Sequence, residues 1–291
     1  MEQDEDGRNQ TVAILLHRLA VPVPKSDVPS YRSLGLEALI REATRWQELR
    51  ISSLGWGTIA LRKREPDRWV EVVNLFGSTG ESALLAASAT VEIELLRQGI
   101  RAGTVPYEYA ISQRFFAEAQ GQQVMGTAHR LANVVARILM IDPDYPWGST
   151  GVGDIADRFP PESDDRKHWI SLTDSKRLVR AGRMSRTPFL KRMSASVNDM
   201  RKRKEWRNLD DQRGADFHRA RRESPYFARM EYRSEPGMKG ITVFGSPRPT
   251  DPAAHSAVER ICTTSRSGLD LLLPVMKVVR RGWVTAAAKM S

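Results

Sequence analysis

The sequence predicts a mainly α protein, a helical bundle that carries a small β-hairpin appendage. Two observations lead to this fold class. Apolar residues recur at steps of three and four along several segments, as they do on the buried face of a helix, and Ser, Pro or Gly punctuates those segments. The chain has 291 residues, of which 41% are apolar. It is therefore long enough to bury a sizeable core.

Four segments are expected to be the principal helices and to pack as one bundle. Residues 78 to 97 open on Ser-Thr-Gly-Glu, the pattern of a capping box. Residues 120 to 140 follow, and these two helices are expected to form the antiparallel heart of the core. The other two helices are residues 188 to about 213 and residues 252 to about 281, with a bend at Pro274.

The β-hairpin is predicted over residues 58 to 76. The residues on either side of Glu65-Pro66-Asp67 are β-branched or aromatic, and the tripeptide itself is typical of a turn. The hairpin belongs to an N-terminal segment, residues 1 to 77, and residues 78 to 291 form the helical domain. Within that domain, residues 142 to 162 are rich in Pro and Gly and are expected to form a long loop.

Composition and motifs argue against several classes of function. The N-terminus is acidic and the most apolar stretches are interrupted, so we expect a cytoplasmic protein with no membrane partner. The single cysteine, Cys262, is expected to be buried. No residues have the spacing of a zinc site, and Gly151-Val-Gly153 follows a loop where a dinucleotide fingerprint requires a strand. Neither a metal nor a cofactor is predicted.

Positive charge is concentrated between residues 176 and 233. This segment holds eighteen Lys and Arg against seven Asp and Glu, whereas the whole chain has a net charge of +10. RNA or DNA is the expected partner, because each phosphate that a cation neutralises releases a condensed counterion. A solvated helix face is the alternative. The predicted nucleic-acid-binding residues are Arg201, Lys202, Arg203, Lys204, Arg207, Arg219, Arg221 and Arg222.

Arg213 and His218 are the candidate catalytic pair. An imidazole can exchange a proton near neutral pH and a guanidinium can stabilise charge on phosphoryl oxygens, so the pair suits metal-independent phosphodiester cleavage. Residues five apart on an ideal helix point about 140° away from each other, so the two side chains converge only if the helix ends or bends. Gly214 tolerates the conformation that ends many helices. A structural role for His218, paired with Asp216 or a backbone carbonyl, is the alternative. His129 is expected to be a hydrogen-bonded packing residue.

The Arg-x4-His pattern, late in a charged helical segment, resembles the HEPN superfamily. These α-helical proteins include ribonuclease toxins and antiviral effectors, and the resemblance covers roughly residues 80 to 288. It implies His218 as the acid/base, Arg213 as the phosphate stabiliser, and a homodimer, since members typically join two motifs across a symmetric interface. Active members usually carry Asn, Asp or His after the arginine, where this chain has Gly214.

Three hypotheses for the function follow. The first is a HEPN-like RNA-binding protein that is a metal-independent endoribonuclease of a toxin or defence system. The second keeps the fold and the nucleic-acid binding without catalysis. The third is an accessory protein whose basic arm binds an acidic partner.

Overall fold

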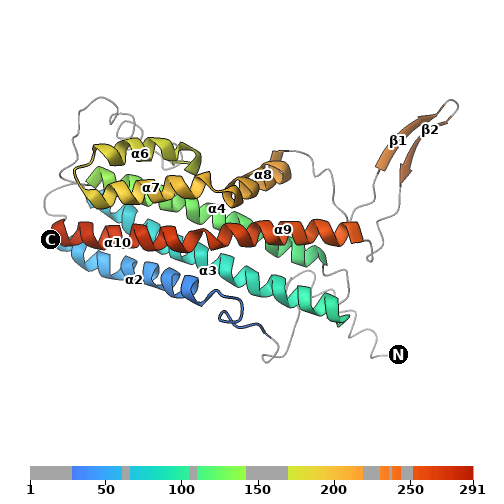
Figure 1. Ribbon diagram of the computed structural model, residues 1–291, viewed down its shortest axis with the longest axis horizontal. Coiled ribbons are helices and arrows are strands. Elements are labelled where there is room, and N and C mark those ends of the chain that lie inside the picture. Colours follow the sequence, from blue (N-terminus) through green and yellow to red (C-terminus); the bar gives the residue numbers. More distant parts are fainter. Residues whose placement is uncertain are drawn as a thin grey trace.

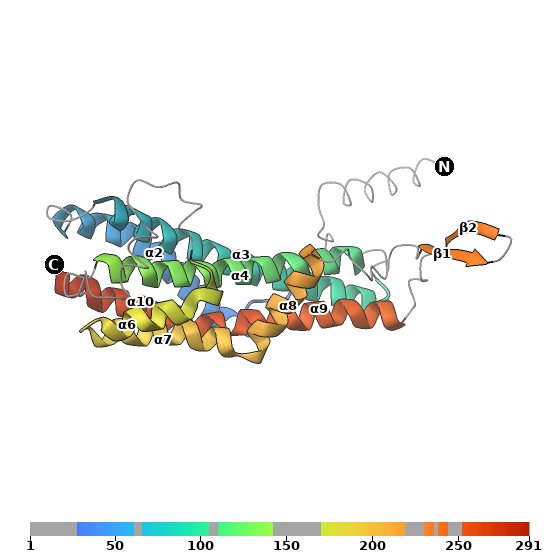
Figure 2. The ribbon, with the colours of Figure 1, turned by 90° about the horizontal axis from the view of Figure 1, so that it is seen from above.

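The structure is a computed structural model, and it describes residues 28–60, 66–104, 110–141, 170–218, 230–235, 238–243 and 252–290. Over these residues the chain is mainly helical, as predicted. The long helices lie side by side and give an elongated bundle (Figures 1 and 2).

Three long helices form the first part of the bundle: α2 (Glu37–Ala60), α3 (Pro66–Ala102) and α4 (Ala110–Ile141). At about 1.5 Å per residue, α3 spans about 55 Å. It packs along α4, as the sequence predicts for the helices of the core. Every residue of α4 from Leu131 to Leu139 is buried, which makes this helix the centre of the bundle.

The later helices cover α4 from other sides. After a short 3-10 turn, η4 (Leu172–Asp174), come α6 (Ser175–Met184) and α7 (Pro188–Lys202), which pack against each other as a helical hairpin (Figure 1). Gly182 allows this contact, because a Cβ at that position would collide with Ser194 on α7. The remaining helices are α8 (Lys204–His218), α9 (Pro252–Asp270) and α10 (Leu272–Met290).

The prediction of a β-hairpin over residues 58 to 76 is wrong. Residues 58 to 60 end α2, and Pro66 is the first residue of α3, where its missing N–H costs nothing. Val72, Val73 and Phe76 are buried at helical spacing, and this packing outweighs their preference for strands. A two-stranded antiparallel hairpin occurs elsewhere, where the sequence did not predict one: β1 (Met230–Glu235) and β2 (Met238–Val243).

Ser78 does not cap a helix, because α3 begins twelve residues earlier and runs through it. The hydroxyls of Ser78 and Thr79 donate to the carbonyl of Leu75 inside α3. The helix thus crosses the domain boundary predicted between residues 77 and 78 without interruption. The predicted loop over residues 142 to 162 lies outside the described residues.

Two of the predicted helices are each divided into two in the structure, α7 with α8 and α9 with α10. The predicted helix from residue 188 to about 213 is divided at Arg203, whose extended backbone (φ −66°, ψ 144°) lets both Met200 and Trp206 reach the core. The predicted C-terminal helix is divided at Leu271, close to the bend predicted at Pro274. The cause is that Pro274 has no N–H for the carbonyl four residues earlier.

Aromatic and charged side chains join the first helices to the last. Phe76 on α3 lies edge-on to both Trp46 and Trp283, with ring centroids 5.4 and 5.0 Å apart. Arg280 on α10 donates to both carboxylate oxygens of the buried Glu42 on α2, at 2.6 and 3.2 Å. Removing one partner of such a buried pair would leave an uncompensated charge, so the pair fixes α10 relative to α2.

Gly80→Ala should destabilise the protein by about 1 to 3 kcal/mol, the usual cost of overpacking. A Cβ at residue 80 would lie 2.6 Å from the carbonyl oxygen of Ala43, so α2 and α3 would have to separate. Gly214→Ala is the matched control, because Gly214 is also inside a helix and a Cβ there meets nothing within 4 Å. It should gain up to about 1 kcal/mol from helix propensity. Urea unfolding measures both, and equal effects would contradict the packing of α2 on α3.

Candidate nucleic-acid interface

Side chains of α4 hold the segment that leads into the α6–α7 hairpin. The amide of Asn133 donates to the carbonyl of Ile170 at 2.9 Å, and its oxygen accepts from the backbone N–H of Ile170 at 3.0 Å. One turn earlier, His129 Nδ1 accepts the backbone N–H of Leu172 at 2.9 Å. These three bonds fix the start of η4 and α6 against the centre of the bundle.

The α6–α7 hairpin has an apolar inner face and a cationic outer face. Its inner face buries Leu178 and Ala181 from α6 and Leu190, Met193 and Val197 from α7. Because these residues must face the core, the basic residues between them are turned outward. Residues 175 to 198 include seven basic residues, and all of them are exposed. Together they form what we call the cationic hairpin surface: Lys176, Arg177, Arg180, Arg183, Arg186, Lys191 and Arg192.

Among the described residues, the segment from 175 to 198, which carries all seven cations, and the neighbouring α10 contain no carboxylate. Helix α10 packs against α7. None of the seven cations forms an ion pair with a carboxylate of the described residues. Among the described residues no ion pair therefore neutralises these side chains, and a surface of this charge is of the kind that attracts polyanions.

The basic residues predicted from residue 201 onward lie at the α7–α8 junction. Lys202, Arg203, Lys204 and Arg207 are exposed, and Arg201 is half-buried. Five carboxylates share residues 199 to 218 with six Lys and Arg, and Lys202 pairs with Asp199 at 2.9 Å. Among the described residues, the stretch without carboxylates thus lies before residue 199, whereas the predicted residues from 201 to 207 share their segment with acidic ones. Three of the predicted residues, Arg219, Arg221 and Arg222, lie outside the described residues.

Gly214 does not end a helix. Helix α8 continues from Lys204 to His218, and the described glycines with positive φ are Gly35 and Gly103. Positions 213 and 218 therefore diverge by about 140° around one helix. Arg213 is exposed, and the side chain of His218 lies outside the described residues. Helix α8 does not turn the two positions toward one point within a single chain.

Arg213 lies instead near a different histidine, His129 of α4. Trp206, Asp210 and Arg213 follow one another at helical steps on α8, and Trp206 meets the His129 ring edge-on with centroids 6.1 Å apart. Burial lowers the pKa of His129, the charge of Arg213 lowers it further, and Asp210 partly opposes this. The Nδ1 lone pair is occupied by the N–H of Leu172, so it is not available to remove a proton from a substrate. His129 is a hydrogen-bonded packing residue, as predicted.

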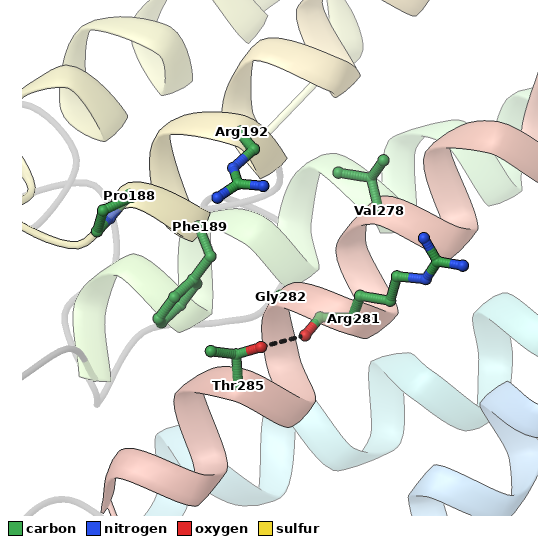
Figure 3. Close-up of a pocket in the computed structure, with 7 residues that line it drawn as sticks. All are labelled: Pro188, Phe189, Arg192, Val278, Arg281, Gly282 and Thr285. Atoms are coloured by element: carbon green, nitrogen blue, oxygen red, sulfur yellow. Dashed lines mark hydrogen bonds between the residues drawn. The ribbon is translucent and has the colours of Figure 1, made fainter.

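An open groove lies at the edge of the cationic hairpin surface, between α7 and α10, and sequence reasoning did not find it (Figure 3). Its volume is about 360 Å³. The α7 side carries the aromatic ring of Phe189 and an exposed guanidinium, and the α10 side carries a second exposed guanidinium. The lining residues are Pro188, Phe189, Arg192, Val278, Arg281, Gly282 and Thr285.

Cys262 is buried in a small cluster with Ile93, Ala117 and Val258, as predicted. Burial raises the pKa of its thiol to about 12, so the thiolate needed for nucleophilic attack is scarce at neutral pH. In the part of the chain that the structure describes, no three His, Cys, Asp or Glu side chains gather as metal ligands would. Over the same residues, no helix combines the length and apolar character needed to span a bilayer.

Comparison of the chain with protein-family models, with curated proteins and with solved structures finds no match.

His129 should titrate below its usual pKa of 6.5, and Arg213→Gln should raise that pKa by removing a nearby positive charge. The pKa of His129 is lower in the folded than in the unfolded chain, so at a pH between the two values only the unfolded chain binds the proton. The contribution of His129 to stability is therefore lost as the pH falls from the unfolded pKa through the folded pKa. NMR titration of the imidazole, assigned with His129→Gln, measures both pKa values. An unchanged pKa in Arg213→Gln would show that the two side chains do not interact.

Proposed function

We propose that this protein binds RNA through the cationic hairpin surface, with the exposed cations of the α7–α8 junction extending the same contact. The proposal is based on the segment from residue 175 to 198, which contains seven exposed cations and no carboxylate. Such a surface favours a partner that supplies regularly spaced negative charge, and a phosphate backbone does so.

The spacing of the cations supports this partner. Lys176, Arg180 and Arg183 recur at steps of four and three along α6, which places neighbouring side chains about 5 to 6 Å apart on one face. They stand on a helix that packs against the core, so little backbone freedom is lost when they meet a ligand. The contacts are to the backbone of the nucleic acid, so by themselves they do not distinguish one base sequence from another.

A nucleic acid fits this surface better than an anionic membrane does. Helices that lie on a membrane insert apolar side chains beside their cations. Among the described residues, no large exposed hydrophobic residue belongs to α6 or α7. Those that occur on other elements are Val28, Tyr31, Ile51, Val70, Leu85, Phe115 and Val284.

Replacing Lys176, Arg180 and Arg183 together with Ser should weaken RNA binding at least about tenfold near 0.1 M salt. Each lost phosphate contact removes about 0.7 from the slope of log K against log salt for single strands, so the slope should fall by about two. Fluorescence anisotropy over a salt series measures both quantities. DNA of the same sequence, measured in parallel, shows whether the sugar affects the affinity.

The control variant removes the same charge from elsewhere, by replacing the exposed Arg32, Arg41 and Arg101 with Ser. Its affinity and salt slope should stay close to those of the original protein. If both triple variants lose affinity equally, net charge rather than this surface is responsible. If neither does, the proposal of RNA binding through α6 is wrong.

Metal-independent RNA cleavage by Arg213 and His218 is the second candidate function. It is favoured by the exposure of Arg213 on α8, the helix that directly follows the cationic hairpin. Because α8 separates the two positions by about 140°, we propose that a second copy of the chain would have to complete the site. That arrangement is also what the resemblance to HEPN proteins implies.

His218→Ala should then reduce RNA cleavage by a factor of about 10² to 10⁴, the usual contribution of one proton-transfer group. RNA affinity should hardly change, because a neutral imidazole contributes little to phosphate binding. Cleavage of a labelled RNA in the presence of a chelator, followed at several protein concentrations, tests both catalysis and dimerisation. Equal rates for the original protein and His218→Ala would leave the binding function alone.

A further inference from the structure

We propose that the groove between α7 and α10 receives one unpaired nucleotide of the bound strand, with its base against Phe189 and its flanking phosphates at Arg192 and Arg281. This proposal rests on the proposed RNA binding and names the form of RNA that the protein selects. It predicts a preference for single strands that the cationic hairpin surface alone would not produce.

The lining of the groove combines apolar side chains with two cations. Pro188, Phe189 and Val278 provide apolar and aromatic surface, and Phe189 is only partly buried. Arg192 is one helical turn beyond Phe189 on α7, and Arg281 projects from α10 (Figure 3). Both guanidinium groups belong to exposed residues, so an occupant can reach them from solvent.

This arrangement matches the chemistry of a nucleotide. A ligand that fits must present a flat, weakly polar group to the ring and negative charge to the two guanidinium groups. A base and its phosphates meet both requirements, and bases stack on aromatic side chains with little dependence on sequence. In a duplex the faces of the bases are already covered by their neighbours, so only an unpaired nucleotide can enter.

The walls of the groove are held by the core and do not have to form on binding. Gly282 lies against Met193 of α7, and a Cβ at residue 282 would collide with the Met193 side chain. The hydroxyl of Thr285 donates to the carbonyl of Arg281 at 2.9 Å, so its oxygen lone pairs stay available to a polar edge of the base. A volume of about 360 Å³ lies within the range of small-molecule sites.

The test compares a single-stranded RNA containing 2-aminopurine with the matched duplex. Phe189→Ala removes the ring, and Thr285→Leu narrows the groove from an exposed position that should not disturb folding. Phe115→Ala is the control, because Phe115 is an exposed aromatic residue on α4 that does not line the groove. Affinity is measured by anisotropy and stacking by quenching of the 2-aminopurine fluorescence.

The original protein should bind the single strand more tightly than the duplex and should quench the fluorescence. Phe189→Ala and Thr285→Leu should each lose about tenfold in single-strand affinity, together with the quenching, while duplex affinity and the salt slope stay unchanged. The control should behave like the original protein. A free nucleoside monophosphate should compete only weakly, since it lacks the contacts of the strand with α6.

Three results would overturn this inference in distinguishable ways. If the original protein binds RNA but both groove variants keep its preference and quenching, the groove does not hold a base and the RNA-binding function stands. If the monophosphate fills the groove tightly while Phe189→Ala leaves strand binding unchanged, the groove serves free nucleotides. If neither RNA probe binds at all, the proposed function fails and the inference fails with it.

Discussion

The burial of residues 131 to 139 of α4 determines how the other helices are arranged around it. From Leu131 to Leu139 this helix exposes no residue, so other helices must cover it on every side. Helix α3 runs along one side, and the α6–α7 hairpin and the C-terminal helices cover others. Polar residues on this helix must also be satisfied inside the core. Asn133 meets that need by binding the backbone of Ile170, which also brings the hairpin to its place.

The position of the charged surface follows from the same packing. Helix α7 must turn Leu190, Met193 and Val197 toward the core, and α6 must turn Leu178 the same way. With the apolar positions fixed, every Lys and Arg between them faces solvent. The absence of carboxylates from residues 175 to 198 then leaves their charge unbalanced. The core thus determines where a polyanion would bind, and α7 places one wall of the groove beside that surface.

The sequence predicts much of the fold and less of the site. Helical periodicity is sufficient to predict the α class. Pro274 is sufficient to predict the C-terminal bend, because proline has no N–H for the hydrogen bond of a continuous helix. Periodicity fails between residues 69 and 76, because β-branched and aromatic residues suit a strand or a helix, and the burial of Val72, Val73 and Phe76 in the helical core decides between them. Counting carboxylates along the basic segment would also have singled out residues 175 to 198, which contain none. The groove could not have been predicted, because it depends on how α7 and α10 pack. The continuation of α8 through Gly214 could not have been predicted either, because a glycine permits a helix to end without requiring it.

Crosslinking can locate the RNA-binding surface on the protein. RNA carrying 4-thiouridine can be crosslinked to the protein, and the modified peptides can be identified by mass spectrometry. Crosslinks should fall within residues 175 to 207 of α6, α7 and α8 and near Arg281 of α10. Crosslinks confined to the exposed cations of α2 and α3, or distributed evenly over the molecule, would contradict the assignment of the cationic hairpin surface as the RNA-binding site.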